Sequence, residues 1–396
     1  MIGSDRAGSG SRHCRWAANV DVTLTASHHG ARSEQESMSV SARNELLGEQ
    51  HIPLVDVAPL FEADPAAVAS VDAALSAAAR DVGFVCIHGM PREAVLDPTE
   101  RARLLAIFAL DDARKRRLYR RKFVPENENV YRGWFPVQPG NLTSKEGMDI
   151  GGDIAHGPAL IVPGDPLREP TPLPDEAALP SWRSAVATYY RAMERVAESL
   201  LRSLARRLGL PAHHFDASFH QGLSTLRLIR YPPRDAAELA TVIDPGVWVE
   251  AQPTRRYIVG APHTDSGFIT LLAQDGVAGL QARLRAGHWV DVPPLEGTLV
   301  VNFGQVLERW SAGRIRATEH RVLGAGIERF SMPFFYEARA EARIAPLPID
   351  PPDAFEPFQF GDYLWNRITS FVEFRGMQME RTCAAGRSPQ ASSQPG

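Results

Sequence analysis

The sequence predicts a mainly β fold with supporting helices, in which a sandwich or barrel of short strands follows an N-terminal α/β region. Three observations support this prediction. Short apolar or alternating runs recur between residues 223 and 337, a long amphipathic helix precedes them, and an Ala-rich helix lies between two strand-like runs nearer the N-terminus. A jelly roll is one architecture that such a set of strands can form.

Regular structure is expected to begin at residues 52–56, a short apolar run that is typical of a strand. Residues 66–80 are rich in Ala with apolar spacing suited to a helix, and residues 83–87 indicate a buried strand. A further helix is predicted over 99–118. Many Gly and Pro residues over 131–176 indicate irregular structure with short strands.

The longest helix candidate covers residues 181–208. Apolar residues recur there at steps of three and four, and Gly209 stands where a glycine often ends a helix. Eight short runs then follow at a spacing that favours a sandwich or barrel. They cover residues 223–231, 257–261, 268–273, 280–284, 289–292, 299–303, 315–322 and 330–337. A final helix is expected over 360–374.

The two ends of the chain lack hydrophobic periodicity. Residues 1–45 are rich in Ser, Gly, Arg and His and contain no apolar segment of a secretory signal. So little apolar surface cannot offset the entropy of ordering, so we expect a disordered extension, for which Met38 is an alternative start. The predicted regions are the extension 1–45, an N-terminal α/β region 46–180, a helix with the β core 181–375, and a flexible tail 376–396.

Composition narrows the class of protein. Hydrophobic residues are 44% and charged residues 23% of the chain, as in ordinary globular proteins. A net charge of −4 argues against a general nucleic-acid binder. No apolar run reaches the roughly 18 residues of a membrane span. We therefore expect a small-molecule substrate, no nucleic-acid or membrane partner, and a monomer or weak dimer.

Cysteine usage indicates the compartment. Cys14, Cys86 and Cys383 lie far apart and form no pair with metal-site spacing. A disulfide framework is therefore not expected, and a reducing cytoplasm is the predicted location.

A metal site is predicted by two histidines and one aspartate. His263 and Asp265 are separated by one residue, and on an extended strand such side chains share a face and can point at one ion. His320 follows later in the chain. Two imidazoles and one carboxylate leave three open positions on six-coordinate iron, the arrangement of non-haem Fe(II) oxygenases. The alternative is that the histidines are separate, hydrogen-bonded core residues.

A carboxylate anchor is indicated by Arg329 and Ser331, which would share one face of a strand. A dicarboxylate whose keto acid end chelates iron needs its far carboxylate fixed, and a guanidinium does this in a bidentate manner. Tyr231 offers a further donor on another strand. The alternative for Arg329 is a surface ion pair with Glu328 or Glu319.

Several short segments between residue 52 and about residue 375 carry a recognisable pattern. They are Ile52-Pro53-Leu54-Val55-Asp56, Gly83-Phe84, Arg132-Gly133-Trp134, Lys145-Glu146, Arg230-Tyr231-Pro232-Pro233, His263-Thr264-Asp265, Gly279-Leu280-Gln281, Val301-Asn302-Phe303-Gly304, Glu319-His320-Arg321-Val322 and Arg329-Phe330-Ser331. In these segments and their order the chain resembles the isopenicillin N synthase-like group of Fe(II)/2-oxoglutarate dioxygenases.

The resemblance implies a distorted double-stranded β-helix with an N-terminal α/β region packed on it, and an enzyme that uses Fe(II), 2-oxoglutarate and O₂. The implied iron ligands are His263, Asp265 and His320. Arg329 and Ser331 would bind the distal carboxylate of 2-oxoglutarate with help from Tyr231. Ile229 departs from the pattern, because many plant members have Asn at this position, two residues before the Tyr.

The implied reaction oxidises an aliphatic C–H of a small molecule, in secondary metabolism, and releases succinate and CO₂. Hydroxylation is the default outcome, with desaturation or cyclisation as variants. Two alternatives stay open. One is a 2-oxoglutarate-independent Fe(II) oxidase of the isopenicillin N synthase type. The other is a non-catalytic binding protein on the same scaffold, which would usually have lost a metal ligand.

The substrate pocket is expected between the 131–156 segment, the region around 235–256 and the C-terminal helix. The Pro-rich stretch 232–256 is predicted to be a strand-poor, mobile cover over its mouth. The side chains expected to line the pocket are Tyr131, Arg132, Trp134, Trp248, Phe334 and Tyr363.

Overall fold

The computed structural model describes residues 52–62, 64–251, 254–351, 354–369 and 374. The predicted extension 1–45 and the predicted tail 376–396 lie outside the described residues, as do Met38, Cys14 and Cys383. The described residues all belong to one unit, Glu49–Gly396. The division expected at residue 180 stays a prediction; strands from both sides of it join one sheet.

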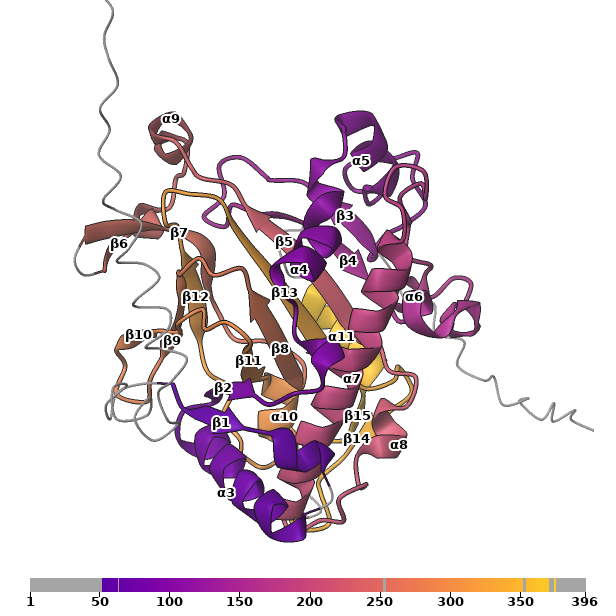
Figure 1. The fold of residues 1–396 in the computed structure, drawn as a ribbon, viewed down its shortest axis with the longest axis vertical. Helices are drawn as coiled ribbons and strands as arrows, with labels where there is room; N and C mark the ends of the chain where they lie inside the picture. The colour runs from indigo at the N-terminus through magenta and orange to yellow at the C-terminus, as the bar shows by residue number, and fades with distance from the viewer. Residues whose placement is uncertain (1–51, 63, 252–253, 352–353, 370–373, 375–396) are drawn as a thin grey trace, which may run out of the picture. The chain divides into compact units, whose positions relative to one another are not determined.

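The N-terminal part opens with a strand–helix–strand unit (Figure 1). Strands β1 (Leu54–Asp56) and β2 (Phe84–His88) pair in parallel, and helix α3 (Pro65–Asp81) connects them. The carboxylate of Asp64 caps α3 by accepting a hydrogen bond from the backbone N–H of Ala66. The three elements predicted in this region are therefore confirmed.

The single helix predicted over 99–118 is instead two helices, α4 (Pro98–Leu105) and α5 (Asp112–Leu118). Each has its own N-cap, because Asp97 and Asp111 both accept a hydrogen bond from a backbone N–H three residues later. The second aspartate starts a new helix in what looks like a continuous pattern. Short 3₁₀-helices are η1 (Ala58–Phe61), η2 (Arg92–Ala94), η3 (Ala106–Ala109), η4 (Pro158–Leu160), η5 (Pro166–Arg168) and η6 (Pro245–Val247).

The long helix α7 (Trp182–Arg207) confirms the longest predicted helix and lies along the large sheet (Figure 1). Its apolar face is buried, and two polar atoms on that face donate hydrogen bonds to backbone carbonyls. Trp182 Nε1 donates to the carbonyl of Leu104 at 2.9 Å, and the Tyr190 hydroxyl donates to the carbonyl of Ser224 at 2.7 Å. Helix α7 therefore joins the N-terminal helices to the β core.

Each of the eight predicted strand runs contains a strand. The run expected over 315–322 forms one only from His320 onward. The strands are β5 (Thr225–Tyr231), β7 (Thr254–His263), β8 (Ile269–Gln274), β9 (Leu280–Arg283), β10 (Trp289–Asp291), β11 (Leu299–Phe303), β12 (His320–Leu323) and β13 (Arg329–Tyr336).

Two sheets form the walls of a double-stranded β-helix, which confirms the predicted fold class. The larger sheet has the order β1-β2-β11-β8-β13-β5-β4-β3, and the smaller has the order β10-β9-β12-β7-β6. The strands not yet located are β3 (Gly133–Phe135), β4 (Glu146–Ile150) and β6 (Trp248–Ala251), together with the separate pair β14 (Arg343–Ile344) and β15 (Phe358–Gln359).

The core has two parts. The larger cluster lies between α7, its neighbouring helices and the large sheet. The smaller cluster includes Phe84, Val259, Leu280, Val300 and Val322, which come from strands of both sheets. This second cluster packs the inside of the β-helix next to the candidate site described below. In the described part of the chain, no helix is long and apolar enough to cross a membrane.

The prediction that residues 232–256 are poor in strands is wrong, while the mobile cover stays a prediction. Helix α9 (Ala236–Ala240) and strand β6 lie within this segment, and β6 pairs with the first half of β7. The pairing of β6 with β7 outweighs the prolines that suggested a loop. The C-terminal helix α11 (Phe360–Ile368) is shorter than expected, and the short helices that were not expected are α6 (Asp153–His156), α8 (Asp216–Phe219) and α10 (Gln305–Trp310).

Candidate active site

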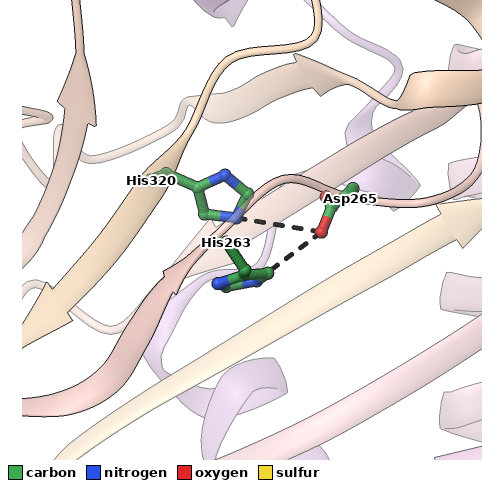
Figure 2. Close-up of side chains that lie close together, drawn as sticks. All are labelled: His263, Asp265 and His320. Carbon is green, nitrogen blue, oxygen red and sulfur yellow. Dashed lines mark ion pairs between the residues drawn. The ribbon is translucent and has the colours of Figure 1, made fainter. Parts of the chain in front are cut away.

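The two histidines and the aspartate converge at the mouth of the β-helix (Figure 2). His263 ends β7 and His320 begins β12; the two residues are cross-strand partners, with ring centroids 4.3 Å apart. The two-residue spacing suggested that Asp265 shares the strand face of His263. It does not, because β7 ends at His263. The turn that follows brings its Oδ1 to 3.7 Å from His263 Nε2 and 3.8 Å from His320 Nε2.

Backbone carbonyls orient both imidazole rings. The Nδ1 of His263 lies 2.8 Å from the carbonyl oxygen of Ala261, and the Nδ1 of His320 lies 3.2 Å from that of Thr318. A carbonyl can only accept, so each Nδ1 carries a proton, and in a neutral imidazole this leaves the lone pair on Nε2. The two Nε2 atoms face Asp265, and the ligand atoms lie within 4.8 Å of one another. This donor set suits a divalent transition metal.

The carboxylate of Asp265 is fixed from its other side. Its Oδ2 accepts hydrogen bonds from Thr270 Oγ1 at 2.6 Å and from Asn302 Nδ2 at 2.7 Å. These bonds leave Oδ1 facing the imidazoles. Such outer hydrogen bonds orient a metal ligand and tune its basicity. Neither Thr270 nor Asn302 was assigned a role from the sequence, although one Asn in the otherwise apolar strand β11 signals a buried polar group that needs a partner.

The protonation states favour a cation in this cluster. Burial, with a smaller effect of His320, lowers the pKa of His263 to about 4. Burial would raise the pKa of Asp265, but the two histidines and the bonds from Thr270 and Asn302 lower it overall. At neutral pH the cluster therefore offers an ionised carboxylate and a neutral His263 imidazole, the forms that bind metals.

A cavity of about 440 Å³ opens onto this cluster. One wall is built by alternate residues of two paired strands of the large sheet, because side chains two positions apart share a face. Strand β5 contributes Thr225, Arg227, Ile229 and Tyr231, and the β13 segment contributes Arg329, Ser331, Pro333, Phe335 and Glu337. Helix α11 adds Leu364 and Ile368, with Phe374 beyond it. The lining thus combines apolar side chains with a smaller number of polar and charged groups.

The predicted carboxylate anchor lies at one end of this wall. Arg329 pairs with Tyr231 across the strands and Ser331 lies two positions on; Arg329 and Ser331 are each 2% exposed. Arg329 Nε and Nη2 donate to neutral oxygens of Val277 and Gln274, while Nη1 has no hydrogen-bond partner among the described residues.

The alternative partners of Arg329 are occupied elsewhere. Glu328 pairs with Arg230, and Glu319 pairs with Arg283. No carboxylate of the described chain forms an ion pair with Arg329, so the surface ion pair considered from the sequence is wrong. The structure instead holds a buried guanidinium with a donor facing inward.

Of the side chains expected to line the pocket, only Tyr131 does so. Phe334 faces the opposite side of β13 and packs on the ring of Tyr190 in α7. Arg132 donates to the side chain of Thr225, and Trp248 packs on Tyr257 at the sheet edge. Trp134 is buried beside Tyr119, and the Tyr363 hydroxyl bonds to the backbone of Ser266. The strand register, which composition does not reveal, decides which aromatic faces the cavity.

This fold and this donor set together define the class of non-haem iron oxygenases. Comparison with known proteins agrees. Residues 224–338 match the model of the 2OG-Fe(II) oxygenase superfamily. The chain is 30% identical over 338 residues to isopenicillin N synthase of Streptomyces clavuligerus, covering 84% of this chain and 98% of that one. It is also 30% identical to a 2-oxoglutarate-Fe(II) type oxidoreductase of Metarhizium majus, covering 72% and 77% of the two chains.

Solved structures show the same architecture. A full-length Neurospora crassa protein in complex with alpha-KG superimposes with a TM-score of 0.65 at 25% identity, covering 81% of this chain and 96% of that one. The rice dioxygenase for auxin oxidation gives a TM-score of 0.58 at 26% identity, covering 81% and 95%. The chain therefore belongs to the isopenicillin N synthase-like family of Fe(II)/2-oxoglutarate oxygenases. It is an Fe(II)/2-oxoglutarate-dependent dioxygenase, with O₂ as the further co-substrate.

Proposed function

We propose that His263, Asp265 and His320 hold Fe(II), and that Arg329, Ser331 and Tyr231 bind the distal carboxylate of 2-oxoglutarate. The observation that carries the proposal is the buried Arg329 Nη1, which has no partner among the described residues and lies on the same cavity wall as the anchor hydroxyl of Ser331. A buried donor without an acceptor costs free energy. A carboxylate at this position would recover that cost through a charge-assisted bond.

The bound Fe(II) would supply the oxidising chemistry, in which O₂ is reduced while 2-oxoglutarate becomes succinate and CO₂. The residues of the chain have separate tasks. His263, Asp265 and His320 orient the metal, and the bonds from Thr270 and Asn302 keep the carboxylate of Asp265 in place. The apolar lining keeps competing water away, as catalysis by a metal in a dry, shaped cavity requires.

We propose that the substrate is a small organic molecule with an aliphatic C–H that is hydroxylated by default, with desaturation or cyclisation as variants. A cavity of about 440 Å³ that is largely apolar supports this size class. The related Neurospora crassa protein has been crystallised with thymine and with 5-formyluracil, which are molecules of this size. A cytoplasmic location and a monomeric or weakly dimeric state stay predictions from the sequence.

The test is the dependence of succinate formation on 2-oxoglutarate concentration. Arg329→Ala should raise the half-saturating concentration roughly ten- to hundredfold, the value of one or two lost charge-assisted hydrogen bonds. Arg230→Ala is the matched control, because Arg230 is on the neighbouring strand but points away from the cavity and pairs with Glu146 and Glu328. Arg230→Ala should leave the half-saturating concentration of 2-oxoglutarate unchanged.

Two results would contradict the proposal. One is an unchanged 2-oxoglutarate requirement in Arg329→Ala. The other is substrate oxidation with O₂ uptake but without succinate, which would favour the 2-oxoglutarate-independent oxidase.

A further inference from the structure

Glu337 is a carboxyl group in the cavity that the proposed chemistry does not use. It directly follows β13 and continues the alternation that faces Arg329, Ser331, Pro333 and Phe335 into the cavity. Glu337 lies eight positions beyond Arg329. At about 3.3 Å per residue, the two are roughly 26 Å apart along the strand. Glu337 therefore cannot share the ligand of the carboxylate anchor.

The backbone around Glu337 fixes the position of its carboxyl group. The N–H of Glu337 donates to Ser224 Oγ at 3.1 Å, and the N–H of Phe268 bonds to the carboxyl. The carboxyl also lies against Gly267, so closely that a Cβ at that glycine would be 1.9 Å from Oε1. Glu337 is thus held beside the turn that follows Asp265.

One oxygen of this carboxyl has no interaction partner within the described chain. Glu337 is 6% exposed, and its Oε2 has neither a hydrogen-bond partner nor an ion pair among the described residues. The Oγ of Ser266, which lines the same cavity beside Gly267, also has no partner there. Buried acids are almost always paired, because an uncompensated charge in an apolar site is expensive. Burial, with a smaller effect of Asp265, raises the pKa of Glu337, because without a partner the neutral acid is favoured over the carboxylate; a bound cation would favour the carboxylate.

We infer that Glu337 is a substrate-recognition residue that binds a protonated amine of the substrate, at the end of the cavity away from Arg329. This inference deepens the proposed function and rests on it. A cation would supply both the missing hydrogen-bond donor and the missing positive charge. A neutral donor supplies only the first, and an anion would be repelled by Glu337 and by Asp265. Ser266 Oγ would accept a second N–H of the same amine.

Arg227, a cation on the same cavity wall, does not remove this preference. Arg227 lies between Thr225 and Ile229, which pair with Phe335 and Ser331. That position is about four residues, or roughly 13 Å, along the strand from Glu337. The carboxylate of Asp149 also binds the guanidinium of Arg227 at 2.5 and 2.8 Å. Amine recognition is therefore assigned to the Glu337 end alone.

The test uses three probes of one shape and different charge: benzylammonium, benzyl alcohol and benzoate. Their dissociation constants are measured calorimetrically under anaerobic conditions with the full-length protein loaded with Fe(II) and 2-oxoglutarate. The wild type should bind benzylammonium at least about tenfold more tightly than benzyl alcohol, and benzoate least. Glu337→Gln keeps the shape and an acceptor for Phe268 but loses the charge, so its Kd for benzylammonium should rise roughly ten- to hundredfold.

Controls separate recognition from folding. Glu296→Gln removes an exposed carboxylate outside the cavity and should bind all three probes like the wild type. Glu337→Gln should bind benzyl alcohol as the wild type does. Equal affinity of the wild type for the amine and the alcohol would overturn the inference, even if Glu337→Gln did not fold. So would an unchanged amine affinity in folded Glu337→Gln. If Arg329 does not bind 2-oxoglutarate, this appears in the 2-oxoglutarate dependence of succinate formation, which is measured separately from these binding constants.

Discussion

Asp149 and Asp265 are two buried carboxylates with different kinds of neighbours. Asp149 in β4 is fully buried and accepts hydrogen bonds from two guanidinium groups, those of Arg227 and Arg120. Asp265 faces two imidazoles and accepts hydrogen bonds from two neutral groups, of Thr270 and Asn302. Burial acts to raise the pKa of both carboxyls, and the neighbours lower the pKa of each overall.

The difference separates a structural charge cluster from a functional one. Arginine is charged at any physiological pH, so the chain itself balances the charge of Asp149. The rings of Phe135 and Phe374 cover Arg120 and complete that cluster. Around Asp265 the Nε2 atoms of the two imidazoles face the carboxylate. The first cluster stabilises the fold, and we propose that the second holds a metal.

The largest expected effect comes from removing the structural carboxylate. Asp149→Ala removes the carboxylate that lies between the buried guanidinium of Arg120 and the half-buried guanidinium of Arg227, which should lower the free energy of unfolding by about 3–5 kcal/mol. Asp265→Ala in the metal-free protein leaves no buried guanidinium without its carboxylate, so the decrease in the free energy of unfolding should be clearly smaller. Urea unfolding at neutral pH measures both. Equal losses in the two variants would show that the two clusters do not differ in kind.

An intermediate effect is expected at the outer hydrogen bonds of Asp265. Asn302→Ala removes a donor to Oδ2 and should weaken Fe(II) binding roughly ten- to hundredfold, as outer-shell changes typically do. Equilibrium titration with Fe(II) under anaerobic conditions measures this change. Asn366→Ala, which alters an exposed residue of α11, is the control. Wild-type iron affinity in Asn302→Ala would mean that Asp265 does not need this bond to face the metal.

The smallest expected effect is a dependence of stability on pH. The pKa of His263 is about 4 in the folded protein, below its reference value of 6.5, so the unfolded chain binds more protons between these values. The free energy of unfolding of the metal-free protein should therefore fall as the pH drops from about 6.5 toward 4. The effect is modest because 43% of the His263 side chain is accessible. His263→Gln should show a flatter profile over this range, and an identical slope would contradict the assignment.

The sequence predicted the strands and the long helix well, because their signals are local. The apolar spacing of α7 and the short runs of the β core recur in the structure almost unchanged. The break between α4 and α5 was missed, since Asp111 caps a helix inside a continuous pattern. Strand β6 was missed because its pairing with β7 outweighs the composition of the segment around it.

The candidate metal ligands could also be found from the sequence, whereas the strand register and the hydrogen bonds that position them could not. His263, Asp265 and His320 are identifiable by residue type and spacing. That His263 and His320 are cross-strand partners depends on the register of two strands far apart in the chain. The same holds for Asn302, which reaches Asp265 because β11 pairs with β8 and places Asn302 opposite Thr270, whereas Thr270 lies only five residues after Asp265. Glu337 gave no signal in the sequence, because an acid after a strand is usually exposed.

The central claim is that one cavity holds Fe(II) on His263, Asp265 and His320 and 2-oxoglutarate on Arg329. The most direct measurement is the visible absorption spectrum of the anaerobic protein after addition of Fe(II) and then 2-oxoglutarate. The wild type should develop a weak metal-to-ligand charge-transfer band that saturates with 2-oxoglutarate. His320→Ala should lack it, and Arg329→Ala should need more 2-oxoglutarate to reach it. A folded wild-type protein that binds Fe(II) but shows no band at any 2-oxoglutarate concentration would contradict the claim.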